Sequence, residues 1–389
     1  MLEESFFTTK YGHKIPIIQE YSDVHNVANF KLIIGSNKER ALQLKPNILD
    51  FLKDLVEYSI MIDFLKSIGH EVNCKTSLDI GGREGYIARL FAGTGKVEKA
   101  NVIEAYDYTK HIDTKKMKLL YRQYQIWKIG RKTPFDFKKV IKRVNNQFFK
   151  QCANFGYYPQ KNSEFWNLKF VKPPAIQHYM VKNIYEHNEK YDFISAFLCL
   201  EYFNHKKLFK KIPELLNNNG IFAFFVDYWW WPRNTTGITG YFPYAAQRLE
   251  RDDFEKYVKK FHENEFEDIM QRYDYFADGL DEKPTLSQYI EEAEKNGLSL
   301  IGCRRLIPHE STHVKTSLPP MILDEYDDTK LDEILKNIHA FRSDVRIEDL
   351  KSTCVMAAFK KIPKKGGSIS KRADELKKNG YGHYAKEKN

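Results

Sequence analysis

The apolar and polar residues of the chain follow two periods, one typical of helices and one typical of buried strands. Residues 48–69 space their apolar positions three and four apart, as an amphipathic helix does. A short apolar run at 75–82 then ends in glycines, and residues 83–95 return to helical spacing before a second apolar run at 101–107. This order of strand, glycine turn, helix and strand is a βαβ unit, which predicts a parallel sheet.

The same alternation continues toward the C-terminus. We expect strands at 176–181, 191–197, 221–228, 297–307 and 352–362, and helices over 205–220 and 285–297. Their order predicts an α/β fold with a doubly wound, mostly parallel sheet of seven strands and helical insertions.

Four segments depart from this pattern. Residues 1–45 lack periodicity and are expected to form an N-terminal extension, and residues 363–389 are polar and basic, as mobile tails are. We predict a basic, helical insertion at about 108–175 and an aromatic, lid-like insertion at 229–283.

Charge is concentrated in two of these places. The 389 residues carry a net charge of +10, yet residues 110–150 hold 13 Lys and Arg against 2 acids, and residues 360–389 hold 10 against 3. A basic segment interleaved with aromatic residues could contact nucleic acid or anionic lipid. Its aromatic residues fall on regular helical faces, however, which favours core packing with a solvated outer face.

The ends and the cysteines restrict the class of protein. The N-terminus has no apolar run that could act as a signal sequence, so we expect a cytoplasmic protein. The longest apolar run, GIFAFFVDYWWW, is interrupted by Asp227 and is too short to cross a bilayer. The five cysteines are scattered and form no CxxC pair, which argues against a disulfide framework and against a zinc site.

The turn after the first predicted strand carries the clearest chemistry. Asp79 ends the strand, and Gly81 and Gly82 form the turn. Gly85 lies where the helix begins. Glycines allow a ligand close to the backbone, and a helix N-terminus offers N–H groups to an anion. A tight turn without any ligand is the alternative interpretation.

Glu104 makes a nucleotide-like ligand the better interpretation. It ends the second strand about twenty residues beyond the glycines, where a carboxylate can accept both hydroxyls of an adenosine ribose. A dinucleotide site would use the same acid, but its GxGxxG pattern needs a glycine where this chain has Arg83.

The stretch 78–107 resembles motif I and the following acidic strand of class I methyltransferases that use S-adenosylmethionine. The usual pattern of that family is (D/E)xGxGxG, which Asp79, Gly81 and Gly85 match and from which Arg83 departs.

Two later segments are similar to the same family. Residues 191–203 resemble its fourth strand and the following turn, with Tyr202 in place of the usual histidine, and residues 215–225 resemble the approach to its fifth strand. The resemblance spans about 45–362 and implies a Rossmann-like methyltransferase domain over 46–362, with S-adenosyl-L-methionine as cofactor.

The resemblance also implies roles for individual residues. The cofactor residues would be Asp79 for its ammonium, Gly81, Gly82 and Gly85 for its methionine part, Glu104 for its ribose, Asn183 for the adenine edge, and Phe197 and Leu198 for the adenine ring. For Asn183, a loop-capping amide is an equal alternative.

Methyl transfer needs an acceptor held in line and protected from water rather than a fixed catalytic residue. If a base helps, the candidates near the ends of strands four and five are Tyr202, His205 and Asp227. Aromatic residues beyond strand five, Trp229, Trp230 and Tyr241 among them, are candidates for the substrate side, with packing of the insertion's own core as the alternative.

A competing motif, HESTH at His309 to His313, fits the HExxH pattern of zinc proteases. Pro308, Pro319 and Pro320 leave little room for the helix that such a site requires, so we predict a solvated loop and no metal.

The sequence therefore favours an enzyme that methylates an oxygen or nitrogen of a small metabolite, which could be anionic given the basic insertion. An RNA- or DNA-directed methyltransferase that uses residues 110–150 and the tail is the second hypothesis. A non-catalytic cofactor-binding or scaffold protein is the third.

Overall fold

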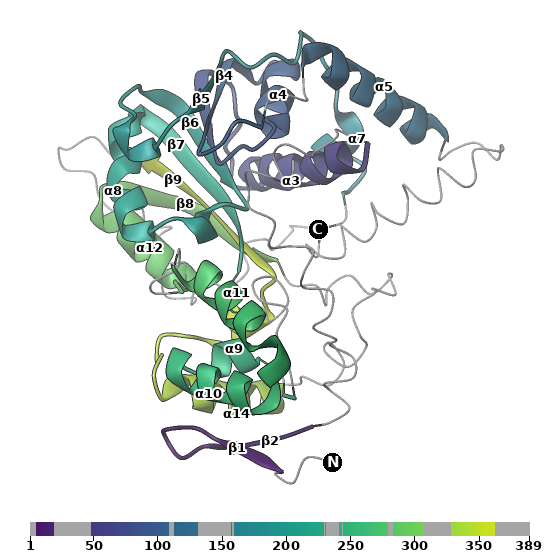
Figure 1. The fold of residues 1–389 in the computed structure, drawn as a ribbon. Coiled ribbons are helices and arrows are strands. Elements are labelled where there is room, and N and C mark those ends of the chain that lie inside the picture. Colours follow the sequence, from purple (N-terminus) through teal and green to yellow (C-terminus); the bar gives the residue numbers. More distant parts are fainter. Residues whose placement is uncertain are drawn as a thin grey trace.

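The computed structural model describes residues 5–18, 48–108, 113–130, 157, 159–228, 230, 241–242, 244–278, 283–306 and 328–361 (Figure 1). The HESTH motif, Trp229 and the segments 19–47, 131–156 and 362–389 lie outside these residues. None of the helices in the described part of the chain is long and apolar enough to cross a bilayer.

A seven-stranded sheet forms the centre of the structure, in the order β5-β4-β3-β6-β7-β9-β8. Its strands are β3 (Cys74–Ile80), β4 (Val97–Glu104), β5 (His178–Val181), β6 (Tyr191–Phe197), β7 (Leu216–Asp227), β8 (Leu298–Leu306) and β9 (Cys354–Lys361). Five neighbouring strands pair in parallel, and β9 runs antiparallel between β7 and β8. The predicted fold class, doubly wound and mostly parallel, is confirmed.

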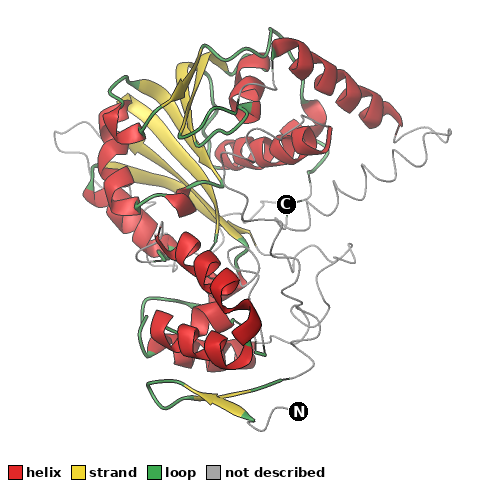
Figure 2. Ribbon diagram, viewed as in Figure 1, coloured by secondary structure: helices red, strands yellow, loops and turns green. Residues whose placement is uncertain are grey.

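Helices cover both faces of this sheet (Figures 1 and 2). One face is covered by α3 (Ile48–Ser67) and α4 (Tyr86–Gly93), and α5 (Thr114–Gly130) and α7 (Glu164–Asn167) pack on the outside of these helices. The other face is covered by α8 (His205–Leu215) and α12 (Leu286–Lys295). Strand β7 has large apolar side chains on both faces of the sheet: Phe222 and Phe224 pack into one hydrophobic core, and Phe225 packs into the other. Helices must therefore cover both faces. A strand buried on both faces is apolar throughout, which is how the sequence revealed it.

Two boundaries differ from the sequence-based expectation. The helix expected over 205–220 ends at Leu215, because β7 begins at Leu216 and pairs there with Tyr191. Residues 217–219 are polar, so the apolar pattern did not predict a strand there. In this part of β7, Asn217 donates from Nδ2 to Asp192 Oδ1 at 2.8 Å. Strand β4 likewise begins at residue 97 rather than 101.

The basic insertion packs as its spacing indicated, as far as it is described. On α5, Met117, Tyr124 and Trp127 are buried, and the Tyr124 ring meets Phe165 of α7 edge-on at 5.9 Å. The aromatic residues of this helix therefore belong to the core, while Leu119 and Ile126 remain exposed.

A second group of helices lies beyond one end of the sheet (Figure 1). It comprises α9 (Ala245–Arg248), α10 (Arg251–Phe261), α11 (Phe266–Asp278), α14 (Asp328–His339) and α15 (Ile347–Lys351). A hairpin of β1 (Phe6–Thr8) and β2 (Lys14–Pro16) packs on it, since the backbone N–H of Lys10 donates to Asp253 Oδ2 at 2.8 Å. Part of the segment expected to be an N-terminal extension is thus tied to this helical group.

Candidate active site

A cavity of about 1010 Å³ opens where the carboxyl ends of β3, β4, β6 and β7 meet. The chain reverses direction along the sheet between β3 and β6, and ligands of doubly wound folds bind at such a position. Its lining comprises Lys53, Asp54, Glu57, Asp79, Ile80, Gly81, Gly82, Arg83, Ile87, Ile103, Glu104, Ala105, Tyr106, Tyr108, Lys182, Asn183, Ile184, Phe197, Leu198, Cys199, Glu201, Tyr202, Phe203 and Asp227.

The glycine turn forms one wall of this pocket. Gly81 has a φ of +63°, and a Cβ at this position would lie 2.7 Å from the Cβ of Cys199. A Cβ on Gly82 would lie 2.6 Å from Asp79 Oδ2. The turn therefore excludes side chains at both positions for reasons of its own packing, whatever ligand it meets.

Arg83 occupies the position at which the family pattern has its middle glycine. Its backbone is left-handed, with a φ of +46°, so it keeps the conformation of the glycine that it replaces. Its N–H donates to Glu104 Oε1 at 2.9 Å, and its carbonyl oxygen accepts from the Tyr179 hydroxyl at 2.7 Å. These bonds hold the turn against the end of β4.

Glu104 ends β4 and lines the pocket. Oε1 accepts from Arg83 and Oε2 accepts from the N–H of Ala105 at 2.8 Å, and each carboxylate oxygen has a second lone pair for a ligand hydroxyl. Burial raises the pKa of Glu104, whereas the two backbone hydrogen bonds lower it.

Asp79 is buried at the end of β3. Oδ1 accepts from the Ser195 hydroxyl at 2.8 Å, and Oδ2 has no hydrogen-bond partner among the described residues. Burial raises the pKa of Asp79 to about 7. Because an unpaired buried carboxylate oxygen is costly, a cationic or hydrogen-donating ligand would stabilise this position.

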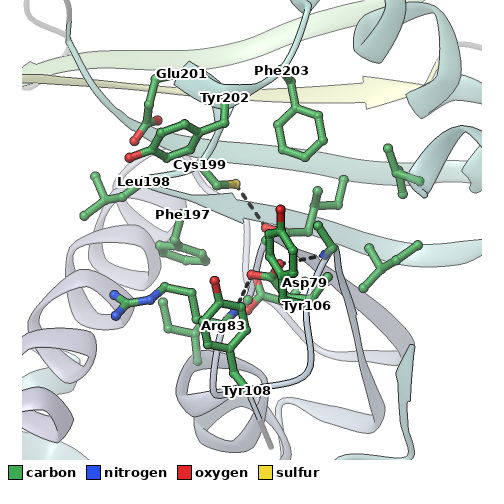
Figure 3. A pocket seen from close by; sticks show the side chains of 18 of the residues that line it. Asp79, Arg83, Tyr106, Tyr108, Phe197, Leu198, Cys199, Glu201, Tyr202 and Phe203 are labelled. Atoms are coloured by element: carbon green, nitrogen blue, oxygen red, sulfur yellow. Dashed lines mark hydrogen bonds between the residues drawn. The ribbon is translucent and has the colours of Figure 1, made fainter. Parts of the chain in front are cut away.

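The turn after β6 forms the opposite wall. Phe197 and Leu198 line the pocket, with Leu198 at a φ of +48°, and the thiol of Cys199 donates to the carbonyl oxygen of Ile80 at 3.1 Å. Figure 3 shows Glu201 and Tyr202 on this side, across from Arg83, Tyr106 and Tyr108.

The rest of the pocket is acidic. Asp54 and Glu57 come from α3, where Lys53 Nζ lies 3.7 Å from Glu57 Oε1, and Glu201 and Asp227 come from the ends of β6 and β7. Burial raises the pKa of all four carboxyl groups, well above the ordinary range for Asp54 and Glu201. Among the described residues, no three His, Cys, Asp or Glu side chains are placed to hold a metal ion.

Comparison with known proteins identifies the family. A family model described as a methyltransferase domain matches residues 39–276, which is more than half of the chain. The chain belongs to this methyltransferase family. The sequence-based expectations of an enzyme of the class I methyltransferases, with S-adenosylmethionine as methyl donor, are thereby confirmed.

Similarity to solved methyltransferase structures is low. Phosphoethanolamine N-methyltransferase 2 of Haemonchus contortus is 14% identical, with a TM-score of 0.36 over 82% of this chain and 60% of that one. The geranyl diphosphate C-methyltransferase of Streptomyces coelicolor A3(2) is 11% identical, with a TM-score of 0.36 over 79% of this chain and 80% of that one. The chain thus spans less than two thirds of the first neighbour. No curated protein matches the chain at a significant level.

The pocket gathers most of the residues that the sequence suggested. Asp79, Gly81, Gly82, Glu104, Asn183, Phe197 and Leu198 line it, as do Tyr202 and Asp227. Asn183 also accepts at Oδ1 from the N–H of Tyr185 at 3.1 Å, so it caps its loop as the alternative interpretation had it.

Other candidates lie elsewhere. Gly85 is not part of the lining, and a Cβ there would meet Ile176. His205 is buried at the start of α8 with its ring edge-on to Tyr289 at 5.9 Å. Trp230 is buried in the core, where the guanidinium of Arg342 lies 5.1 Å from its ring centroid.

Tyr241 is also remote from the described lining, because its ring packs on Phe261 and His262. Among the described aromatic residues proposed for the substrate side, packing of the helical group is thus the observed role.

Sequence reasoning missed the contribution of α3. Lys53, Asp54 and Glu57 lie on a helix whose spacing assigns charged residues to a solvated face. A signal was present in the sequence: Glu57 stands between Val56 and Tyr58, inside the stretch that the helix buries, and it is only 3% exposed.

Proposed function

We propose that the chain transfers a methyl group from S-adenosylmethionine to an oxygen or nitrogen of a small metabolite. The main support for this proposal is a cavity of about 1010 Å³ in which the candidate cofactor residues and several further acidic side chains share one space. Ligand pockets typically measure about 300–1,000 Å³, so this cavity suits a cofactor together with a small acceptor.

The described residues fit the cofactor. The unpartnered Oδ2 of Asp79 would accept a hydrogen bond from the ammonium group of the cofactor, and the glycine turn would contact its methionine part. Glu104 would accept hydrogen bonds from the ribose hydroxyls. Asn183, Phe197 and Leu198 would take the adenine. When bound, S-adenosylmethionine supplies an electrophilic methyl group on a sulfonium.

The protein's own task is to place the acceptor and exclude water. The side chains of Tyr202, Phe203 and Tyr106 line the pocket, and closer packing of these rings on a bound acceptor would exclude solvent from the reacting atoms. Asp227 and Tyr202 are the candidates that remain at the pocket for moving a proton from the acceptor.

Isothermal titration calorimetry with S-adenosylmethionine tests the cofactor site. Glu104→Ala removes the acceptor of two ribose hydroxyls, so we expect the affinity to fall about tenfold to a hundredfold. Glu98→Ala, in an exposed part of the same strand, is the matched control and should bind as the wild type does. Equal affinities for both variants would remove Glu104 from the site.

The acceptor class is tested with methyl-labelled S-adenosylmethionine and a cell extract separated into small molecules and RNA. Label in the small-molecule fraction supports the proposal. Label in RNA, together with RNA binding that weakens steeply with salt, would instead favour the nucleic-acid hypothesis and a role for α5. Cofactor binding without transfer to either fraction would favour the non-catalytic hypothesis.

A further inference from the structure

We propose that the methyl acceptor is a cationic amine, whose ammonium group is held by Glu201 and Asp227. This inference rests on the proposed function, since it specifies the substrate class of the same pocket.

Glu201 carries the first part of the argument. It is the middle residue of a single helical turn, η4 (Leu200–Tyr202), directly after β6, and it is 4% exposed. It lines the pocket, yet its Oε2 has no hydrogen-bond partner among the described residues. A buried carboxylate oxygen without a donor is costly to the fold, so its presence indicates a donor that arrives with the substrate.

Asp227 supplies a second carboxylate next to Glu201. It ends β7, and burial together with the nearby Asp227 carboxyl group raises the pKa of Glu201 well above its usual range. Burial raises the pKa of Asp227, and two groups oppose this only in part: the Lys53 ammonium, and the Cys354 thiol, which donates a weak hydrogen bond to Oδ1 at 3.3 Å.

The other charged groups around the pair leave the balance negative. Lys53, Asp54 and Glu57 face it from α3, Asp79 and Arg83 from the glycine turn, Glu104 from β4 and Lys182 from the loop after β5. The described lining thus holds six acidic side chains against three cationic ones. Lys53 is engaged with Glu57, and Arg83 NH2 lies 3.7 Å from Glu84.

Acidic side chains still outnumber cationic groups when the single net positive charge of S-adenosylmethionine is included. An ammonium bound beside Glu201 and Asp227 would favour the ionised form of both acids and gain charge-assisted hydrogen bonds, whereas an anionic acceptor would raise the pKa values of these acids further. The basic residues of α5, which suggested an anionic substrate, do not belong to the lining. The charge that decides the substrate is therefore that of the pocket rather than that of the whole chain.

The same carboxylates serve the chemistry. An ammonium must first lose a proton, and the proton passes to Glu201 or Asp227. The freed lone pair of the nitrogen forms a bond to the methyl carbon while the methyl–sulfur bond breaks and leaves its electron pair on sulfur. The products are the methylated amine and S-adenosylhomocysteine, and the carboxylic acid returns its proton to water.

A matched ligand series tests the proposal by binding alone. The protein is first saturated with S-adenosylhomocysteine, and its dissociation constants are then measured at pH 8 for butylamine, benzylamine and 2-phenylethylamine. The corresponding alcohols and carboxylates, butanol, benzyl alcohol, 2-phenylethanol, butanoate, benzoate and phenylacetate, are measured in the same way. We expect at least one amine to bind about tenfold or more tightly than its alcohol, and every carboxylate to bind most weakly.

Three variants locate the effect. Glu201→Gln keeps the shape of the side chain and removes its charge, so the preference for the amine over its alcohol should fall about tenfold, while affinity for S-adenosylhomocysteine stays unchanged. Glu186→Gln, at an exposed position outside the pocket, should keep the full preference. Asp227→Asn is the second pocket variant and should behave as Glu201→Gln does, so that a folding defect in one leaves the other informative.

The outcomes separate this inference from the proposed function. If S-adenosylhomocysteine does not bind, the proposed function itself fails. If it binds but no amine is preferred over its alcohol, or if the preference survives in both Glu201→Gln and Asp227→Asn, the amine inference is overturned and the proposed function stands.

Discussion

At the scale of single residues, Arg83 shows that a motif can lose a residue and keep its geometry. The left-handed φ of +46° is the conformation that glycine adopts freely and that other residues adopt at a cost. In the sequence, Arg83 stands where the family pattern has a glycine, which raised the question whether the turn keeps the conformation of that pattern. The structure resolves this because the backbone bonds of Arg83 to Glu104 and Tyr179 hold the turn in its place.

Two substitutions at this position separate the backbone effect from the side chain. Arg83→Gly and Arg83→Ala both remove the guanidinium, but only alanine retains a Cβ in the left-handed region. We expect the glycine variant to be the more stable by about 1 kcal/mol, measured by urea denaturation. An alanine variant of equal or greater stability would contradict the strain assigned to Arg83.

Asp79 should make stability depend on pH. Its pKa is raised by burial from 3.8 to about 7, so its contribution to stability is fully present below about pH 4 and is lost as pH rises through 7. Asp79→Asn stays neutral and can still accept from Ser195. At pH 8 the ligand-free variant should exceed the wild type by on the order of 2 kcal/mol, and at pH 4 the difference should vanish. A pH-independent difference would refute the assignment.

At the scale of elements, the apolar strands were predictable because burial on both faces leaves a continuous apolar signal. The candidate Glu104 was found for a related reason, since it follows the apolar pair Val102 and Ile103, whereas the candidate Asp79 was found from the glycines that follow it. The acids of α3 were not found, because helical spacing alone cannot tell a face that points to solvent from one that points into a polar cavity. The helices between 244 and 278 pack on a hairpin near the N-terminus, and no local pattern encodes that contact.

The packing of the βα turn against the loop after β6 can be tested at Gly81. A Cβ there would lie 2.7 Å from Cys199 Cβ in a left-handed backbone, so Gly81→Ala should destabilise the protein by about 3 kcal/mol in urea denaturation. Gly297 has a φ of +85° with open space around its Cβ position, so Gly297→Ala should cost only about 1 kcal/mol. Equal costs would show that the contact with Cys199 is unimportant.

At the scale of the whole molecule, a buried polar cluster connects the sheet to the second helical group. Asp349 of α15 accepts from Arg305 of β8 at 2.6 Å and from the hydroxyl of Tyr228, just after β7, at 2.5 Å. Arg305 and Asp349 are each 1% exposed. This buried ion pair fixes the position of α15 against β8. Removal of one partner leaves the other charge buried without compensation, which is strongly destabilising.

Asp349→Asn should therefore cost about 3 kcal/mol, because it leaves the Arg305 guanidinium buried without a counter-charge. Asp274→Asn is the control: its pair with Arg251, at 3.0 Å, is exposed and should contribute less than about 1 kcal/mol. Chemical denaturation compares the two variants, and similar losses would show that burial adds nothing to the Arg305 pair.

The place of β9 in the sheet bears on how the protein is made. Strand β9 is the last of the described strands in chain order, yet it lies between β7 and β8, and its Cys354 lies opposite Asp227, which lines the pocket. While the ribosome is still translating residues 354–361, β8 has no strand to bind, and one side of β7 stays open. The seven-stranded sheet that carries the pocket is therefore completed only after residues 354–361 have been synthesised.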